Sequence, residues 1–318
     1  MKLLITLVLM SLASCMNNPT FTLLHYNVKE LSDAKLLDPE NKQATELISF
    51  LNSQQFDILS INEIRYNPTV MQIINTKLDT KELKEEVFVK ANTGNKSKPN
   101  QPDIVNFGKV PGEYSNGALI KFKILNEVII QDLKWSTFFK EEDFSNFKLS
   151  NNDEIPKDIE LFDKSFSDTT LLIEDKQVHL LLLHTVPAYG FGNANSINFL
   201  RNQRQLEFLR WYLNLDGLSE NKANIKPLSK GDSFVLVGDL NVDYKAKTLG
   251  AKILSSIIKK ASTWLPQSQM DYTHPEPKLM LDYIITSKNI KAVDAKIYKD
   301  ASNVISDHLP IWGKFEIH

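Results

Sequence analysis

Three short polar sequences in the last third of the chain each lie beside an apolar, strand-like run. They are Gly238-Asp239-Leu240-Asn241, Leu281-Asp282-Tyr283-Ile284 and Ser306-Asp307-His308. Three polar residues upstream follow apolar runs in the same way, namely Asn27, Glu63 and His184. Carboxylates, amides and imidazoles held at strand ends are the groups that metal-assisted cleavage of a phosphate ester requires. The residue types and their settings therefore indicate an enzyme.

In this order, these residues resemble the motifs of the endonuclease/exonuclease/phosphatase superfamily, which has the DNase-I-like fold. The resemblance covers residues 21–318. It implies an α/β fold, a four-layer α/β sandwich in which two mixed β-sheets pack face to face and are flanked by helices. It also implies that the polar residues meet at one rim of the sandwich and hydrolyse phosphate esters there.

The metal site implied by the resemblance consists of Glu63, Asn27 and Asp307. A phosphodiester is anionic and repels a nucleophile, so a divalent cation is expected to neutralise one of its oxygens. Mg²⁺ prefers oxygen ligands and keeps several waters, so one or two carboxylates suffice. We therefore expect Mg²⁺ (or Mn²⁺ or Ca²⁺) at Glu63. Without the other motifs, Glu63 would be only a solvated residue at a strand end.

Asp282 and His308 are expected to form an orienting pair, in which the carboxylate fixes the tautomer of the imidazole and raises its basicity. His308 and Asp239 are then the candidates to take a proton from water, and the sequence leaves open which of them does so. Asn241 is expected to donate to the phosphate oxygens. Without the other motifs, Asp239-Leu240-Asn241 would be interpreted as a turn.

His184 is expected to lie opposite this pair, where it contacts the phosphate or protonates the leaving oxygen. The alternative is a structural histidine bonded to backbone. His25 and His179 lie within strands and are expected to face the packing, so neither is assigned a role. Tyr26, next to Asn27, is expected on the other face of its strand with a structural role.

A narrower resemblance links the chain to a set of exported bacterial members of the superfamily. It rests on segments 107–114, 184–187 and 201–205 and on the segment around Trp135. Glu113 and Ser115 stand where those members have Gln and Gly, which puts the substrate role of this loop in doubt. Arg201 and Arg204 are candidates to clamp a phosphate, and a role on the helix surface is the alternative.

The elements that position these residues follow from the periodicity of the apolar residues. The sequence predicts strands over 21–28, 57–62, 118–122, 128–130, 170–173, 178–183, 233–238, 281–286, 292–298 and 310–317. It predicts helices over 41–54, 68–78, 197–214 and 247–260, with long loops over 92–113 and 186–196. Strands in groups separated by helices suggest a mixed sheet sandwich with helices outside.

The composition is that of an ordinary globular protein, with 318 residues, 42% of them apolar and 24% charged. The polar motifs span both ends of the chain, which favours a single domain over 21–318. The formal net charge of −2 excludes a global basic field, although not a local basic groove. Avid, sequence-independent binding of nucleic acid is therefore not expected.

The N-terminus is predicted to be an export signal. Lys2 and the apolar run Leu3–Leu12 suit residues 1–14 as a lipoprotein signal peptide, since the run is too short to span a bilayer. Leu12-Ala13-Ser14-Cys15 resembles a lipobox, which makes Cys15 the lipidated residue and residues 15–20 a tether; an ordinary cleaved signal is the alternative. The single cysteine also excludes an intrachain disulfide. Met16 after Cys15 favours the outer membrane or cell surface, and the protein is expected to be a monomer anchored to a bacterial membrane.

The substrate is left open between nucleic acid, a lipid headgroup as in sphingomyelinases, and a small phosphate ester. Trp135, Phe138 and Phe139 either form an aromatic hairpin that inserts into a membrane or pack in the core. Two other classes of function are alternatives to an enzyme. One is a lipid-anchored binding protein without catalysis, and the other is a structural lipoprotein whose motifs are coincidental. The complete set of acids, amides and histidines favours the enzyme over both.

Overall fold

Two six-stranded sheets form the centre of the molecule. The computed structural model describes residues 18–80, 82–95, 105–140, 142–149 and 151–318. The first sheet contains, in spatial order, β11 (Ile290–Ile297), β12 (Ile311–Ile317), β1 (Thr20–Leu31), β2 (Ile58–Ile64), β4 (Ser115–Ile120) and β3 (Glu85–Val89). The second contains β5 (Lys123–Ile130), β6 (Phe166–Ile173), β7 (Lys176–Leu183), β8 (Phe234–Asp239), β10 (Asp282–Thr286) and β9 (Ser262–Thr263).

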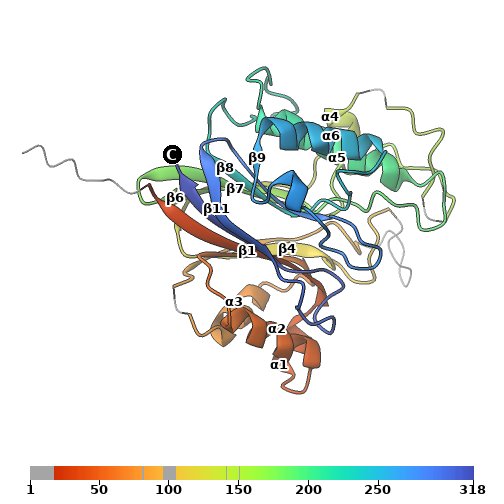
Figure 1. The fold of residues 1–318 in the computed structure, drawn as a ribbon. Helices are drawn as coiled ribbons and strands as arrows, with labels where there is room; N and C mark the ends of the chain where they lie inside the picture. Colours follow the sequence, from red (N-terminus) through yellow and green to blue (C-terminus); the bar gives the residue numbers. More distant parts are fainter. Residues whose placement is uncertain (1–17, 81, 96–104, 141, 150) are drawn as a thin grey trace, which may run out of the picture.

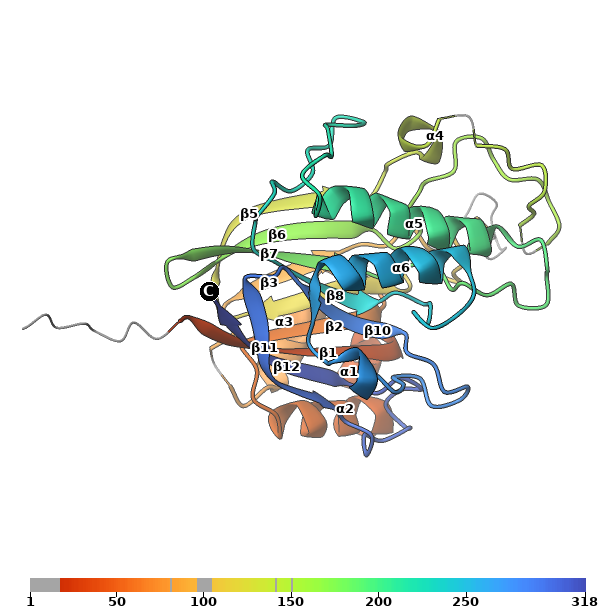
Figure 2. The ribbon, with the colours of Figure 1, turned by 45° about the horizontal axis from the view of Figure 1, so that its top comes forward.

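Helices cover the outer face of each sheet (Figures 1 and 2). The first sheet is covered by α1 (Asp33–Leu37), α2 (Lys42–Asn52) and α3 (Val70–Lys77). The second is covered by α5 (Ile197–Leu213) and α6 (Leu249–Lys260), with the single turn α4 (Trp135–Phe138) and the short 3₁₀ turn η1 (Gln267–Gln269) in connecting segments. The order helix, sheet, sheet, helix confirms the predicted four-layer α/β sandwich.

The apolar residues divide into two cores because strand side chains alternate between the two faces of a sheet. In β1, Leu23 belongs to the core that includes the space between the sheets, whereas Leu24 and Tyr26 belong to the core beneath the helices. The ring of Tyr26 packs edge-on against Phe50 of α2 at a centroid distance of 5.8 Å. Tyr26 therefore lies on the helix-covered face, as predicted.

The helices dock through apolar stripes of the predicted spacing. Ala44, Leu47 and Leu51 of α2 are buried, and the side chain of Asn41 caps the helix by accepting from the backbone N–H of Ala44. The same pattern in α6 begins at Thr248, which accepts from the N–H of Ala251. An N-cap of this kind contributes about 1 kcal/mol, so burial of the stripe provides most of the stabilisation.

Strand direction brings the polar strand ends to one rim. β1 is parallel to β2, and β7 is parallel to β8, so all four strands end at that rim. β10 is antiparallel to β8, and β12 is antiparallel to β1, so these two strands begin there. The register pairs Asp282 with Asp239 directly. Segments that are far apart in the sequence thus meet by topology alone.

The structure adds an edge strand that was not predicted, and it decides between the two alternatives for the segment around Trp135. β3 has no predicted counterpart; it is a short strand at the edge of its sheet, in which only Val87 and Val89 are buried. Trp135 and Phe138 have exposed fractions of 0% and 2%. Phe138 packs against Phe208 and Trp211 of α5, and Trp135 packs edge-on against Phe144. Of the two alternatives for these aromatic residues, packing in the core is therefore the one that the structure shows for Trp135 and Phe138.

The predicted signal peptide, Cys15 and most of the tether lie outside the described residues. Among the residues that the structure does describe, no helix combines the length and apolar character that crossing a bilayer requires. The lipoprotein interpretation therefore stays a prediction.

Candidate active site

The polar residues of the first sheet reach the rim through irregularities in two strands. The pairing of β2 with β4 slips between Ile61 and Ile64, and Glu63 within this bulge has a φ of +65°. The pairing of β1 with β2 slips just after Asn27, where Lys29 and Glu30 have φ values of +49° and +55°. Bulges re-aim side chains, and left-handed backbone is costly for residues other than glycine. The backbone thus stores strain where it turns Glu63 toward the site.

The amide of Asn27 joins carboxylates from the two sheets. Its Nδ2 donates to Glu63 Oε1 at 3.0 Å and to Asp239 Oδ2 at 3.2 Å, while its Oδ1 accepts from the backbone N–H of Lys29. Asn27 and Glu63 therefore lie side by side, as predicted. The side-chain NH₂ group of Asn27 orients the two carboxylates, whereas its oxygen bonds to the backbone.

Asn241 holds Asp239 from the other side. Its backbone N–H donates to Asp239 Oδ1 at 2.8 Å, and its Nδ2 donates to Asp239 Oδ2 at 3.1 Å and to the carbonyl of Thr185 at 3.0 Å. The side-chain amide predicted to donate to phosphate oxygens is thus bonded within the chain in this structure.

Asp282 connects two buried imidazoles. His308 Nδ1 lies 2.8 Å from Asp282 Oδ2, and His25 Nε2 lies 3.2 Å from Asp282 Oδ1. Ser60 Oγ lies 3.1 Å from the other nitrogen of His25, so a chain of contacts runs Ser60, His25, Asp282, His308. The backbone N–H of Asp282 donates to the hydroxyl of Thr273. The carboxylate therefore fixes Nδ1 of His308 as a donor and leaves Nε2 directed at Asp239, 3.9 Å away.

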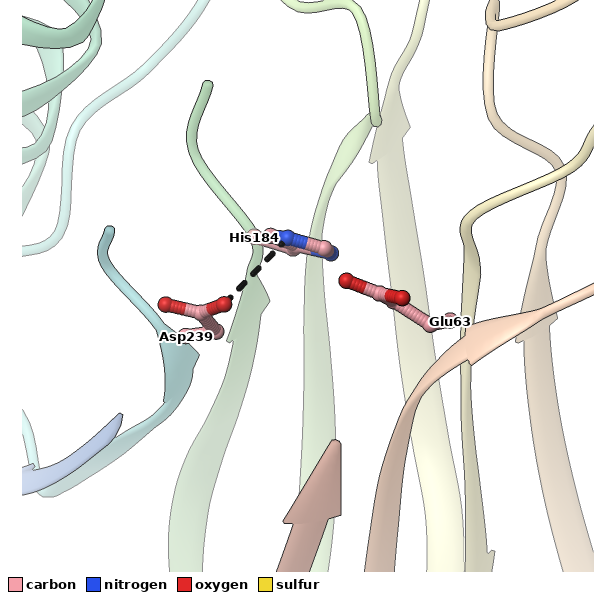
Figure 3. A group of neighbouring side chains, drawn as sticks. All are labelled: Glu63, His184 and Asp239. Atoms are coloured by element: carbon pink, nitrogen blue, oxygen red, sulfur yellow. Dashed lines mark ion pairs between the residues drawn. The ribbon is translucent and has the colours of Figure 1, made fainter. Parts of the chain in front are cut away.

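His184 lies between two carboxylates (Figure 3). Its Nε2 is 3.5 Å from Asp239 Oδ2, and its buried Nδ1 has no hydrogen-bond partner among the described residues. Burial and the positive charge of Lys164 hold the pKa of His184 well below its ordinary value. A neutral, unpartnered ring nitrogen aimed into a polar site is available to bind a ligand.

Burial and charge act in opposite directions on the two groups predicted to handle protons. Burial raises the pKa of Asp239 to about 7, with a further contribution from Asp282 and against the attraction of His308. Burial lowers the pKa of His308, but the negative charges of Asp282 and Asp239 outweigh it and raise the pKa to about 10. The pair holds one acid and one base in contact, which is the arrangement that proton transfer needs.

These groups face one pocket of about 610 Å³. Asp307 lies in its wall, half-exposed, and forms an ion pair with Lys29 at 2.9 Å. Lys164, which no sequence motif indicated, is buried in the same wall, where Nζ donates to Asp163 at 2.8 Å and to the carbonyl of Thr185 at 3.3 Å. The ligand role of Asp307 stays a prediction.

The two candidate phosphate-clamping arginines form hydrogen bonds and ion pairs within the chain. Arg201 lines the pocket, but its guanidinium donates to the carbonyls of Leu161, Val105 and Glu160 and to Asn106 Oδ1. Arg204 makes a two-pronged contact to Glu142 and a further one to Glu207. In this structure both guanidinium groups therefore hold α5 against its neighbours, and their binding of a phosphate stays a prediction.

The donor set fits a divalent cation. Glu63, His184 and Asp239 each offer one donor atom within 4.8 Å of the others. Burial raises the pKa of Glu63 against the opposing effects of the Asn27 hydrogen bond and the charges of His308 and Lys164, so a bound cation would favour its ionised form. Carboxylate oxygens suit Mg²⁺ and Mn²⁺, and an imidazole nitrogen is also acceptable to Mn²⁺. The unpartnered Nδ1 of His184 is consistent with such a ligand.

His25, like Lys164, is a contributor to the site that sequence reasoning missed. It was expected only to face the packing, yet it contacts Asp282 from the neighbouring sheet. A signal was present: His25 lies two residues before Asn27, and residues two apart in a strand share a face. Glu113, which departs from the narrower motif, is buried and accepts from the backbone N–H of Lys109, so it holds its own loop.

The fold of this chain is similar to that of several solved structures, although no similarity is found by sequence. No protein-family model matches the chain, and no curated protein matches it in sequence. Solved structures do match over most of the chain. An endonuclease/exonuclease/phosphatase from Beutenbergia cavernae is 13% identical with a TM-score of 0.61, covering 94% of this chain and 72% of that one.

Two further similar structures are enzymes with distinct names. The human Nocturnin catalytic domain with a bound sulfate anion is 15% identical, with a TM-score of 0.59 and coverage of 95% and 96%. Sphingomyelinase C from Streptomyces griseocarneus is 14% identical, with a TM-score of 0.51 and coverage of 93% and 99%. At such identities the likeness establishes the fold. The fold expected from the six polar motifs, that of the endonuclease/exonuclease/phosphatase proteins, is therefore confirmed.

Proposed function

We propose that this chain, which has the fold of the endonuclease/exonuclease/phosphatase proteins, is a divalent-metal-dependent hydrolase of phosphate esters. One observation carries the proposal: the Asp282–His308 pair directs an imidazole nitrogen at Asp239, beside Glu63 and His184, in one pocket. A scaffold or binding protein has no need for a buried carboxylate that orients an imidazole toward a second carboxylate.

Glu63 and Asp239, with His184 and Asp307 as further donors, would hold Mg²⁺, Mn²⁺ or Ca²⁺. When bound, the cation supplies charge that neutralises a phosphate oxygen. Asp282 keeps His308 in one tautomer, and Asp239 and His308 share the transfer of a proton from the attacking water. His184, neutral and held between Glu63 and Asp239, contacts the phosphate or the leaving oxygen.

The similar structures support the reaction class in general terms. They include proteins named endonuclease/exonuclease/phosphatase, a sphingomyelinase and a Nocturnin domain that binds sulfate, an anion shaped like phosphate. These names span nucleic acid and lipid substrates. The proposal for this chain is accordingly phosphate-ester hydrolysis, with phosphodiesters as the first substrates to test.

The test is an assay of the purified protein with Mg²⁺, Mn²⁺ or Ca²⁺ and with EDTA. Substrates are bis-p-nitrophenyl phosphate, plasmid DNA, RNA, sphingomyelin and sugar phosphates. Asp239→Asn and His308→Gln should each lower kcat by about 10²-fold or more, and EDTA should abolish turnover. His179→Gln, which alters a histidine outside the pocket, is the matched control and should retain the rate. Equal turnover in all three variants would show that the assigned groups do not carry the reaction.

We further propose that the enzyme is exported and anchored to a bacterial membrane through a lipid on Cys15. Support comes from the lipobox-like Leu12-Ala13-Ser14-Cys15 and the apolar run before it. In cells fed a labelled fatty acid, the wild-type protein should take up the label and sediment with membranes, whereas Cys15→Ser should do neither. A labelled Cys15→Ser protein would contradict the assignment.

A further inference from the structure

The exposed aromatic side chains gather at the active-site pocket. Among the described residues, the exposed large apolar side chains include four aromatic ones, which are Phe107, Tyr189, Phe191 and Phe199. All four belong to segments that line the pocket, whereas the exposed aliphatic residues, such as Leu218 and Val293, lie elsewhere. Single exposed apolar residues are ordinary, but a cluster confined to a functional pocket points to a ligand.

Phe107 and Phe191, the two of these rings that line the pocket themselves, come from loops attached to different sheets. Phe107 belongs to the connection between β3 and β4, and Phe191 to the connection between β7 and α5. Both line the pocket that contains Asp239 and His308, with exposed fractions of 57% and 70%. Each ring therefore presents much of its surface to whatever enters the pocket.

Buried contacts fix the two loops relative to each other. Arg201, near the start of α5, donates to the carbonyl of Val105 at 3.0 Å and to Asn106 Oδ1 at 2.7 Å, next to Phe107. The loop that carries Phe191 is tied to the site because the N–H of Ala188 donates to the carbonyl of Asn241 at 3.0 Å. The rings are thus held by the same structure that holds the catalytic groups, so little ordering is needed on binding.

The backbone at Phe191 is strained, which also points to a functional role of this residue. Its φ of +47° is unusual for a bulky side chain. Its ring is supported by Tyr189, at a centroid distance of 5.2 Å and in an edge-to-face arrangement. A strained position that exposes a phenyl ring at a pocket is a candidate for function rather than packing.

We propose that Phe107 and Phe191 are specificity-determining residues, which bind a planar aromatic group of the phosphate ester by stacking. This inference rests on the proposed phosphoesterase function and names its substrate class: a small ester whose organic part is a nucleobase or another aryl ring. Base–aromatic stacking contributes on the order of tenfold or more in affinity per ring.

The charges around the pocket favour a small substrate over a polymer. Lys29 is paired with Asp307 at 2.9 Å and Lys164 with Asp163 at 2.8 Å, so the pocket lysines are already neutralised. Proteins that track a nucleic-acid backbone need a run of available cations. A volume of about 610 Å³ suits a single nucleotide-sized ligand.

Two chromogenic phosphodiesters with the same leaving group test the proposal. Thymidine 5′-(p-nitrophenyl phosphate) carries a base, and methyl p-nitrophenyl phosphate does not. Wild-type protein should show a kcat/KM about a hundredfold higher for the thymidine ester, about tenfold for each ring. Phe107→Ala and Phe191→Ala should each lower this ratio by about tenfold. Leu218→Ala, which removes a side chain that is 85% exposed outside this pocket, should leave the ratio unchanged.

Phe191→Leu distinguishes stacking from general apolar contact, since leucine keeps an apolar surface but has no ring. A ratio that falls as in Phe191→Ala supports an aromatic ligand. A retained ratio, or preferential hydrolysis of sphingomyelin in vesicles, would favour an aliphatic ligand and overturn the proposal. Replacement of thymidine by a phenyl ester separates a requirement for the base from a requirement for any aryl ring.

Binding measurements separate this inference from the proposed function. If neither these esters nor the substrates of the first assay are hydrolysed, the hydrolase proposal fails, but calorimetry with thymidine 5′-monophosphate and with inorganic phosphate still tests the aromatic contact. The nucleotide should bind about a hundredfold more tightly than phosphate, and the difference should disappear in the Phe107→Ala/Phe191→Ala double variant. Equal affinity for both ligands in the wild-type protein would refute stacking.

Discussion

Asp282 is shared by two imidazoles, one on each of its oxygens. Because His25 and Ser60 occupy one side of the carboxylate, Asp282 cannot rotate without breaking buried hydrogen bonds. The position of His308 is therefore set by the interior of the sandwich and not by the surface loop on which it lies. His25 is accordingly a positioning residue, because it acts through Asp282.

Asp282→Asn tests the orienting role. The amide can donate as well as accept, so it no longer requires a proton on Nδ1 of His308. We expect kcat to fall by about 10²-fold or more and the ¹⁵N shifts of the His308 ring to show a changed tautomer. Unaltered ring shifts together with full activity would contradict the assignment. Thermal unfolding of the same variant shows whether a loss of activity reflects loss of the fold.

Glu63 and Glu30 form a matched pair for testing metal binding. Both line the pocket and both have positive φ, but only Glu63 belongs to a group of donors that could hold an ion, while Glu30 accepts from the hydroxyl of Tyr114. Titration calorimetry with Mn²⁺ should show affinity reduced about tenfold or more by Glu63→Gln, since a charged ligand is lost. Glu30→Gln should bind Mn²⁺ as the wild type does. The reverse result would show that the metal binds at Glu30 and not at Glu63.

At the scale of the elements, the site depends on how closely β7 and β8 approach. Gly238 has a φ of +150°, and a Cβ there would lie 1.9 Å from the carbonyl oxygen of Leu183. This contact fixes Asp239 and His184, the next residue of each strand, against each other. Glycine is required at this position because any side chain would separate the strands.

Gly238→Ala should therefore lower both stability and activity. We expect a loss of about 3 kcal/mol in the free energy of unfolding, from overpacking added to backbone strain. Gly231→Ala is the matched control, because Gly231 has a φ of +97° but no atom within 4 Å of its Cβ position. It should cost only the backbone strain, about 1 kcal/mol. Equal losses in urea denaturation would show that the close approach is unimportant.

The predictability of the elements differed between regular and irregular segments. The apolar stripe of 41–54 predicted α2, and the short continuous apolar run within 233–238 predicted β8, each within two residues of its observed bounds. The bulges in β1 and β2 could not be predicted, because nothing in the sequence near Asn27 or Glu63 shows where the pairing slips. That slip is decided by the neighbouring strand.

At the scale of the whole molecule, a second buried polar group lies far from the pocket, between the second sheet and α5. His179 Nδ1 lies 2.8 Å from Asp168 Oδ1, and Tyr212 of α5 donates to Asp168 Oδ2 at 2.7 Å. Burial lowers the pKa of His179, but Asp168, by hydrogen bond and charge, and Asp232, by charge, outweigh it, so the pKa is raised overall. Protonation of His179 is thus linked to folding.

The sign of this linkage gives a pH prediction. A histidine whose folded-state pKa is raised stabilises the fold fully below its unfolded pKa of about 6.5, and this contribution is lost as pH rises through the higher folded pKa. The difference in unfolding free energy between wild type and His179→Gln should therefore shrink from pH 5.5 to alkaline pH. Asp168→Asn should weaken the pH dependence in the same way. A difference that grows with pH would mean that the pKa of His179 is lowered.

The sequence by itself determined which polar residues belong to the candidate site and their order along the chain. Residue types beside apolar runs gave Asn27, Glu63, His184, Asp239, Asp282 and His308, because strand ends and polar residues are both local properties. Local periodicity likewise determined most strands and helices and, with the motifs, the fold class.

Only the tertiary structure decided which of these groups touch. Asp282 lies between His25 and His308, and Arg201 bonds to a loop nearly a hundred positions earlier in the chain. The reason is physical: a carboxylate or guanidinium can bond to any buried partner within about 3 Å. Which partner comes that close depends on strand order, register and bulges, and these are set by the packing of the two sheets as a whole.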